Sequence, residues 1–326
     1  MRVLFLLLSP YAMCVVHQTR VEERMVATVH RVQSALQSAK CEVQSSEEAC
    51  IIAEDDLETD FGRETLRKSL STRRHCVIRR STAFSTKLVE DYRSFPPAQP
   101  IQNRPEEFIG LFADPHTDSK FLECRFGLDG TLDPKCPAKI NDLGHSLGSL
   151  GLRILSSLDD PTYARLCDIP LERKRNEVST TVFRLCRYES IKEDVAFGSH
   201  TDTTFLTLVP CASQPGLEVF DPSIGAFLCH EASPLACPGR DVICLAGEFL
   251  DLLSNGKYGS AVHRVILTSA DAKQRRTTRS STPLLLRAKR SASWLCLPLT
   301  TIWKVLAKAS SEEEVRQMLI EQQQYG

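Results

Sequence analysis

The sequence has almost no excess charge of either sign. Its 40 basic and 41 acidic residues leave a net charge of −1 at pH 7, so its charge does not favour nucleic acid or an anionic membrane as a partner. It also lacks an apolar run long enough to cross a bilayer as a helix. With 42% hydrophobic and 25% charged residues among 326, the composition is typical of a globular protein with a sizeable core.

Cysteine pairs with the short spacing of zinc or redox sites are absent, although the sequence contains 13 cysteines. An odd number of scattered cysteines in a chain of this length does not describe a disulfide scaffold. The pattern is typical of buried thiols in a reducing compartment, and we expect a cytoplasmic protein.

The first 20 residues leave a second location open. Arg2 precedes an apolar stretch over residues 3–16, interrupted by Pro10, and the whole resembles a signal peptide with a poor cleavage site. The chain would then be secretory or organellar. The same residues can instead form an apolar first strand, or lie before the true start if Met25 is the initiator.

The strongest pattern lies between residues 183 and 287, around His200-Thr201-Asp202. In a strand, residues two apart point the same way, so the imidazole of His200 and the carboxylate of Asp202 would share one face. His263 lies in a later strand-like run and would supply a third ligand. Two histidines and one carboxylate that leave positions open are the ligand set of non-haem Fe(II) oxygenases.

Short strands separated by turn residues surround these candidates. Their ranges are 203–209, 216–220, 226–229 and 241–245. A helix-favouring run over 248–253 ends at Ser254-Asn255-Gly256, before the strand that holds His263. This rhythm predicts a mainly β domain with a jelly-roll core and flanking helices.

Residues 183–287 resemble the catalytic domain of the 2-oxoglutarate and Fe(II)-dependent dioxygenases, in the branch of the plant flavonoid and hormone oxygenases and isopenicillin N synthase. The motifs that carry the likeness are Arg187-Tyr188, His200-Thr201-Asp202 with its Leu-Thr-Leu strand, Pro215–Asp221, Pro238–Val242, Ala246–Glu248, Leu253–Gly256 and Val262–Val265. The resemblance implies a double-stranded β-helix in which His200, Asp202 and His263 are the catalytic iron ligands. It also implies 2-oxoglutarate and O2 as co-substrates, ascorbate as a reductant, and hydroxylation of a small organic substrate with release of succinate and CO2.

The resemblance further implies a clamp for the co-substrate. In the family an Arg-x-Ser after the last histidine grips the distal carboxylate, and here Arg279-Ser280-Ser281 matches it, with Tyr188 adding a phenol hydrogen bond. A guanidinium can pair with a carboxylate through two hydrogen bonds, which suits this role. The connection from His263 is longer than usual, so Arg275 or Arg276 is an alternative clamp.

Other functions stay open on the sequence. An oxidase like isopenicillin N synthase would use the iron without 2-oxoglutarate, and a jelly-roll binding protein would be catalytically inactive. A hydroxylase of protein side chains is a third alternative. The substrate, and the choice among hydroxylation, desaturation and cyclisation, are not encoded in a recognisable motif. We expect a monomer that acts on a small molecule.

A second His-Thr-Asp tripeptide occurs at residues 116–118. Asp114-Pro115 precedes it, and no His-Arg-Val partner follows at a suitable spacing. Because proline and aspartate favour turns, we expect this copy to lie in a loop and to bind no metal.

Four parts are expected along the chain: a targeting or disordered segment (1–20), a helical and mixed region packed on the barrel (21–175), the jelly-roll domain (176–290) and a helical extension (291–326). In the second part we expect helices at 21–57, 62–71 and 140–158, a strand at 75–78 and a poorly periodic cover for the barrel mouth at 104–139. The acidic run 44–60 is expected to be solvated. His145 and His230 are expected to be core or boundary histidines. A capping box at Ser310 predicts the last helix.

Overall fold

The computed structural model of the chain describes residues 50–84, 95–102, 104–113, 119–189, 195–267 and 278–290. All of them lie in one compact unit, Ala35–Leu295. The N-terminal apolar stretch, the second His-Thr-Asp copy, Arg275 and Arg276, and the C-terminal extension beyond residue 290 fall outside these residues. No helix in the described part of the chain is long and apolar enough to cross a membrane.

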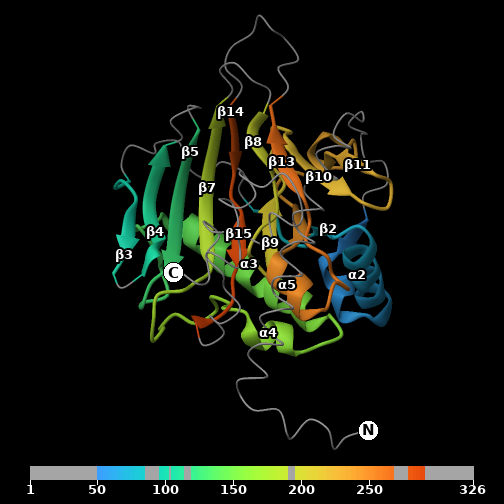
Figure 1. Cartoon of the computed structure of the whole chain (residues 1–326), viewed down its shortest axis with the longest axis horizontal. Helices are drawn as coiled ribbons and strands as arrows, with labels where there is room; N and C mark the ends of the chain where they lie inside the picture. The colour runs from blue at the N-terminus through green and yellow to red at the C-terminus, as the bar shows by residue number, and fades with distance from the viewer. Residues whose placement is uncertain are drawn as a thin grey trace, which may run out of the picture. The chain divides into compact units, whose positions relative to one another are not determined.

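Two sheets make up most of this unit (Figure 1). The larger contains β1 (Ile51–Ala53), β2 (His75–Arg79), β3 (Gln99–Ile101), β4 (Arg104–Ala113), β5 (Lys120–Phe126), β6 (Leu132–Asp133), β7 (Val182–Glu189), β9 (Leu206–Pro210), β12 (Asp241–Ala246), β14 (Thr278–Ser281) and β15 (Leu284–Leu286). Its order is β1-β2-β12-β9-β15-β7-β5-β4-β3, with β14 on β7 and β6 on β5. The smaller contains β8 (Val195–His200), β10 (Leu217–Asp221), β11 (Ala226–Leu228) and β13 (His263–Ile266), in the order β11-β10-β13-β8.

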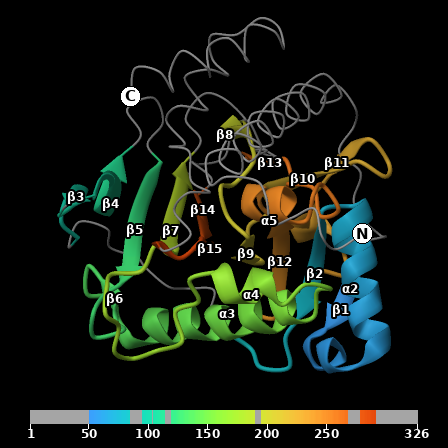
Figure 2. The same ribbon diagram turned by 60° about the horizontal axis from the view of Figure 1, so that its bottom comes forward.

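Helices pack outside the larger sheet and in the connections between strands. The described helices are η2 (Glu54–Glu58), α2 (Asp60–Thr72), α3 (Ala138–Ser156), α4 (Thr162–Leu166), η4 (His230–Ala232) and α5 (Glu248–Leu253). The expected helices at 62–71 and 140–158 correspond to α2 and α3. A hydroxyl cap starts α2, because Thr59 accepts a hydrogen bond from the backbone of Gly62 at 3.0 Å. Figure 2 shows α3 running across the sheet beneath its strands.

Alternating side chains on the larger sheet build two cores. Leu284 and Leu286 on β15 join the apolar cluster that includes α3. Residues on the opposite face of the sheet, such as Val209 and Ile243, pack instead against Val265 and other apolar side chains of the smaller sheet. Two sheets that enclose a core, with helices outside, form the expected jelly roll, and this prediction is confirmed.

Two segments differ from expectation. Residues 104–139 were expected to be a poorly patterned cover, but β4 and β5 extend the larger sheet beyond β7. The inward face of β5 carries charged residues, Glu123 and Arg125, which hide the alternation of a buried strand. In the acidic run, Glu54 is buried rather than solvated, because it pairs with Arg80 at 3.2 Å and Arg153 at 2.8 Å.

Candidate active site

The first ligand candidate ends one strand and the third begins its neighbour. His200 is the last residue of β8, His263 is the first of β13, and the two are register partners. Their ring centroids lie 4.2 Å apart. Contrary to expectation, Asp202 does not share a strand with His200 but lies in the connection between β8 and β9. Hydrogen bonds, rather than strand alternation, therefore direct its carboxylate toward the histidines.

The three side chains converge. Each offers one ligand atom, and these atoms lie within 4.8 Å of one another. Nε2 of His200 is 3.7 Å from Oδ1 of Asp202, and Nε2 of His263 is 3.5 Å from Oδ2. The Nδ1 atoms face the carbonyls of Gly198 at 2.8 Å and Ala261 at 3.2 Å. Because a carbonyl only accepts, each Nδ1 carries the ring proton and each Nε2 keeps the electron pair that a metal needs.

The electrostatics keep this cluster in a ligating form. Burial, reinforced by the nearby His263, lowers the pKa of His200 to about 3. Burial alone would raise the pKa of the Asp202 carboxyl. The two facing imidazoles, a hydrogen bond from the Thr207 hydroxyl at 2.6 Å and nearby Arg184 outweigh burial and lower this pKa. At neutral pH the cluster thus offers a carboxylate and a neutral imidazole at His200, as metal ligation requires.

The connection that carries Asp202 is fixed by α5. The backbone nitrogen of Glu248 donates to the carbonyl of Asp202 at 2.9 Å. The Glu248 carboxylate accepts a hydrogen bond from the Thr201 hydroxyl at 2.5 Å. Gly247 permits this close approach, because a Cβ there would lie 2.2 Å from the carbonyl oxygen of Thr204. The Ala-Gly-Glu motif therefore positions a ligand candidate without supplying one.

A pocket opens beside the cluster, between the two sheets. Its walls include the three clustered residues together with Tyr188, Arg279 and Ser281. Arg279 on β14 is the register partner of Tyr188 on β7. The guanidinium carbon of Arg279 lies 5.6 Å from the centroid of the Tyr188 ring. The structure thus brings every described candidate of the sequence to one pocket.

Sequence reasoning missed an internal partner of Arg279. Glu231, in η4, pairs with it through two bonds, from Nη2 at 2.6 Å and from Nε at 3.2 Å. Both side chains are almost wholly buried, and the Glu231 carboxylate also accepts the backbone N–H groups of Ala212 and Leu217. Burial would lower the pKa of Arg279, but the Glu231 charge outweighs it and raises that pKa. The Nε and Nη2 atoms of Arg279, the expected clamp, are therefore already paired with Glu231.

A second missed residue is Arg184, which lines the pocket and forms an ion pair with Glu123. Its position four residues before Tyr188 on β7, on the same face, was the available signal. His145 and His230 lie outside the cluster, as expected. His145 bonds to two backbone carbonyls, and His230 bonds to Asp241 at 2.9 Å.

The fold and the cluster define a class: a jelly-roll protein with two histidines and an aspartate converging beside its internal pocket. Residues 179–286 match the sequence profile of the 2OG-Fe(II) oxygenase superfamily.

Relatives agree with this assignment over short stretches. The sexual differentiation process protein isp7 of Schizosaccharomyces pombe is 36% identical over 86 residues, which are 26% of this chain and 20% of that protein. Gibberellin 3-beta-dioxygenase 4 of Arabidopsis thaliana is 32% identical over 121 residues, which are 36% of this chain and 30% of that protein. The matched regions therefore span less than a third of the length of these relatives.

Solved structures show the same fold at low identity. A full-length Neurospora crassa protein in complex with alpha-KG and 5-formyluracil has a TM-score of 0.56 and 18% identity, over 86% of this chain and 99% of that one. The dioxygenase for auxin oxidation of rice has a TM-score of 0.51 and 18% identity, over 75% of this chain and 84% of that one.

Proposed function

We propose that the chain is an Fe(II)- and 2-oxoglutarate-dependent dioxygenase that oxidises, by default hydroxylates, a small organic substrate. The observation that carries the proposal is the convergence of His200, Asp202 and His263 within 4.8 Å of one another. Two imidazole nitrogens and one carboxylate form the ligand set of non-haem Fe(II) sites with open positions. The match of residues 179–286 to the oxygenase profile and the jelly-roll fold support the same function.

In this proposal the metal is held by Nε2 of His200, Nε2 of His263 and a carboxylate oxygen of Asp202. When bound, iron and the co-substrate supply the chemistry: O2 and 2-oxoglutarate are consumed, succinate and CO2 are released, and one oxygen atom is added to the substrate. The protein contributes placement and a protected site. Thr207 and Glu248 fix Asp202, and an apolar wall limits access of water.

Aromatic rings form that wall. The Phe197 ring lies 4.6 Å from the His200 ring and 5.8 Å from the Phe121 ring, measured between centroids. Phe121 in turn lies 5.5 Å from the ring of Tyr188. A substrate between these rings and the metal would meet an apolar surface on the side away from the ligands.

The co-substrate would bind at the other end of the pocket. No partner of Nη1 of Arg279 is found among the described residues, which leaves this atom for the distal carboxylate. The Ser281 hydroxyl lies on the same strand and lines the same pocket. Burial raises the pKa of Tyr188 well above its usual range, so the phenol keeps its proton and can donate it in a hydrogen bond.

The test is succinate formation by the purified full chain with Fe(II), 2-oxoglutarate and ascorbate. Substituting alanine for His200, Asp202 or His263 should each abolish it. The second His-Thr-Asp tripeptide provides a matched control, because His116→Ala and Asp118→Ala should retain the activity. Wild-type rates in all three variants of the cluster would refute the proposal.

The Glu231 contact favours a second function, an oxidase that uses the metal site without 2-oxoglutarate. If Arg279 stays paired with the carboxylate of Glu231, this arginine has a structural role and does not bind the distal carboxylate of 2-oxoglutarate. Oxygen consumption that proceeds at the same rate without 2-oxoglutarate would select the oxidase. Strict dependence on 2-oxoglutarate would select the dioxygenase.

The proposal extends to the organisation and location of the chain. Residues 176–290 would be the catalytic domain, 21–175 would pack on it and 291–326 would form a helical extension. The ten described cysteines are all free thiols, which supports a reducing compartment such as the cytoplasm. A small-molecule substrate and a monomeric state complete the proposal.

A further inference from the structure

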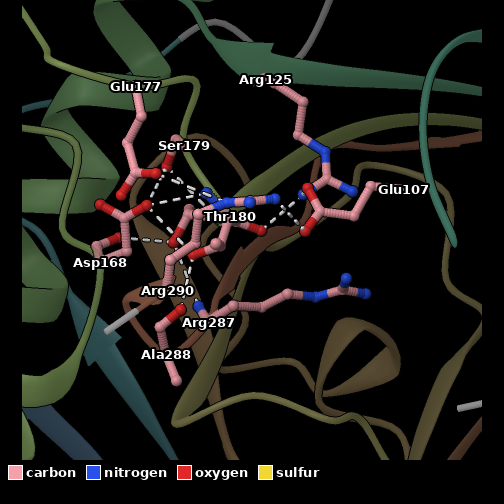
Figure 3. Close-up of polar contacts among 10 residues, drawn as sticks. Glu107, Arg125, Asp168, Glu177, Ser179, Thr180, Arg287, Ala288 and Arg290 are labelled. Carbon is pink, nitrogen blue, oxygen red and sulfur yellow. Dashed lines mark hydrogen bonds and ion pairs between the residues drawn. The ribbon is translucent and has the colours of Figure 1, made fainter. Parts of the chain in front are cut away.

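Three arginines lie on the inward face of the larger sheet beyond the metal cluster. They are Arg125 on β5, Arg184 on β7 and Arg287 directly after β15. Arg125 is only 1% exposed, and its Nη1 donates to the carbonyl of Thr180 at 2.6 Å. The Thr180 backbone is itself anchored, because its N–H donates to the carboxylate of Asp168 at 2.8 Å. Figure 3 shows this anchored group.

The carboxylates around these arginines do not match them in number. Glu123 pairs with Arg184. Glu107 is shared, because it lies 3.4 Å from Arg125 and 3.4 Å from Arg290. In the described part of the chain, Arg287 has no ion pair, and its buried Nε has no hydrogen-bond partner. In Figure 3 its side chain extends without a contact drawn to the guanidinium.

Such an arrangement is unfavourable for the protein alone. Burial and repulsion from Arg287 lower the pKa of Arg125 to about 10. Burial and repulsion from Arg184 also lower the pKa of Arg287, although Glu123 opposes the shift. Arg287 is half-buried and its Nε is buried without a partner; a buried polar atom without a partner costs free energy, and such atoms are found where a ligand completes them.

The arginines lie near the proposed reaction site but away from the co-substrate clamp. Arg184 lines the pocket and acts on the charge of Asp202. Arg279 is the register partner of Tyr188, four residues from Arg184 along β7, which corresponds to roughly 13 Å at the rise of a strand. Leu285, which also lines the pocket, lies two residues before Arg287. The pocket therefore has a cationic group at each end.

We infer that Arg184 and Arg287, supported by Arg125, form a subsite for the carboxylate of the substrate. The substrate is then a small organic acid whose apolar body lies against Phe121 and Phe197. This inference rests on the proposed function for the identity of the pocket, but the binding itself requires no turnover. A guanidinium pair would recognise the acid by charge-assisted hydrogen bonds and discriminate against its uncharged amide.

The test compares two probes of the same shape, phenylacetate and phenylacetamide. Their affinities for the full-length protein are measured by calorimetry under anaerobic conditions with Fe(II), with and without saturating 2-oxoglutarate. The wild type should bind the acid about tenfold or more tightly than the amide, as expected for a charged hydrogen bond. Arg287→Gln and Arg184→Gln should each reduce this ratio to about one, by loss of the same contact. Arg173→Gln, at an exposed arginine, should leave the ratio unchanged.

Stability measurements keep the outcome interpretable. Because Arg287 lacks an internal partner among the described residues, Arg287→Gln should unfold at the same temperature as the wild type or higher. A much lower unfolding temperature would mean that Arg287 has a structural partner, and would overturn the inference. Equal binding of acid and amide by the wild type, or an unchanged preference in both glutamine variants, would overturn it as well. If either result occurs while succinate formation still depends on 2-oxoglutarate, the inference fails but the proposed function stands.

Discussion

At the scale of single residues, the internal carboxylate beside Arg279 decides how strongly the co-substrate can bind. Glu231 neutralises the guanidinium before any ligand arrives. Removing its charge by Glu231→Gln should therefore lower the KM for 2-oxoglutarate several-fold. A tenfold change in affinity would correspond to about 1.4 kcal/mol of binding free energy. The same substitution leaves Arg279 buried without a counter-charge, so it should cost about 3 kcal/mol of stability without ligand. Steady-state kinetics and thermal unfolding measure the two effects.

A matched control exists on β10. Glu218 is also buried and pairs with an arginine, Arg264, at 2.7 Å, but neither residue lines the pocket. Glu218→Gln should lower stability without altering the KM for 2-oxoglutarate. If Glu231→Gln leaves this KM unchanged or raises it, Glu231 does not compete with the co-substrate for Arg279.

At the scale of elements, the start of α5 sets the position of Asp202. Gly247→Ala should be destabilising, because its Cβ would meet the Thr204 backbone at 2.2 Å. Overpacking of this kind typically costs about 1–3 kcal/mol, and backbone cannot move aside as a side chain can. We also expect weaker Fe(II) binding, since displacement of residues 201–205 carries Asp202 with it. Calorimetric metal titration and chemical denaturation test both effects.

Gly198 supplies the comparison for this substitution. It lies in β8 beside His200, and a Cβ there would meet nothing within 4 Å. Gly198→Ala should therefore change stability and metal affinity little. Equal metal affinity in the Gly247 and Gly198 variants would show that the α5 contact does not position the ligand.

The elements that sequence could predict are those with regular local signals. The strands around His200 and His263 alternate, and α3 has a periodic apolar face. β5 escaped prediction because its inward residues Glu123 and Arg125 are charged, and their partners come from the two strands on either side of it, β7 and β4. The Glu231 contact escaped because 48 residues separate it from Arg279. Local pattern indicates where a strand lies, whereas ion pairs across the fold depend on topology.

For the molecule as a whole, the cluster and the arginines share one property. Each gathers groups whose charge or lone pairs would be better satisfied by a ligand than by the protein. Desolvation of Asp202 opposes its ionisation, and the half-buried Arg287 has a buried Nε without a described hydrogen-bond partner. Folding therefore proceeds against a local cost that ligand binding can relieve, as expected of a functional pocket.

The final prediction concerns the stability of the whole chain. We assume that Fe(II) and 2-oxoglutarate bind the native state and not the unfolded chain. Each ligand, at a concentration 100 times its Kd, should then add about 2.7 kcal/mol to the free energy of unfolding. The unfolding temperature, measured anaerobically, should rise by several degrees with Fe(II) and again with 2-oxoglutarate, and a chelator should reverse both increases. Asp202→Asn should abolish the increase from Fe(II) and lower the ligand-free unfolding temperature, because the lowered pKa of Asp202 means that its partners stabilise the carboxylate in the folded state. An Fe(II)-dependent increase that survives Asp202→Asn would place the metal elsewhere in the molecule.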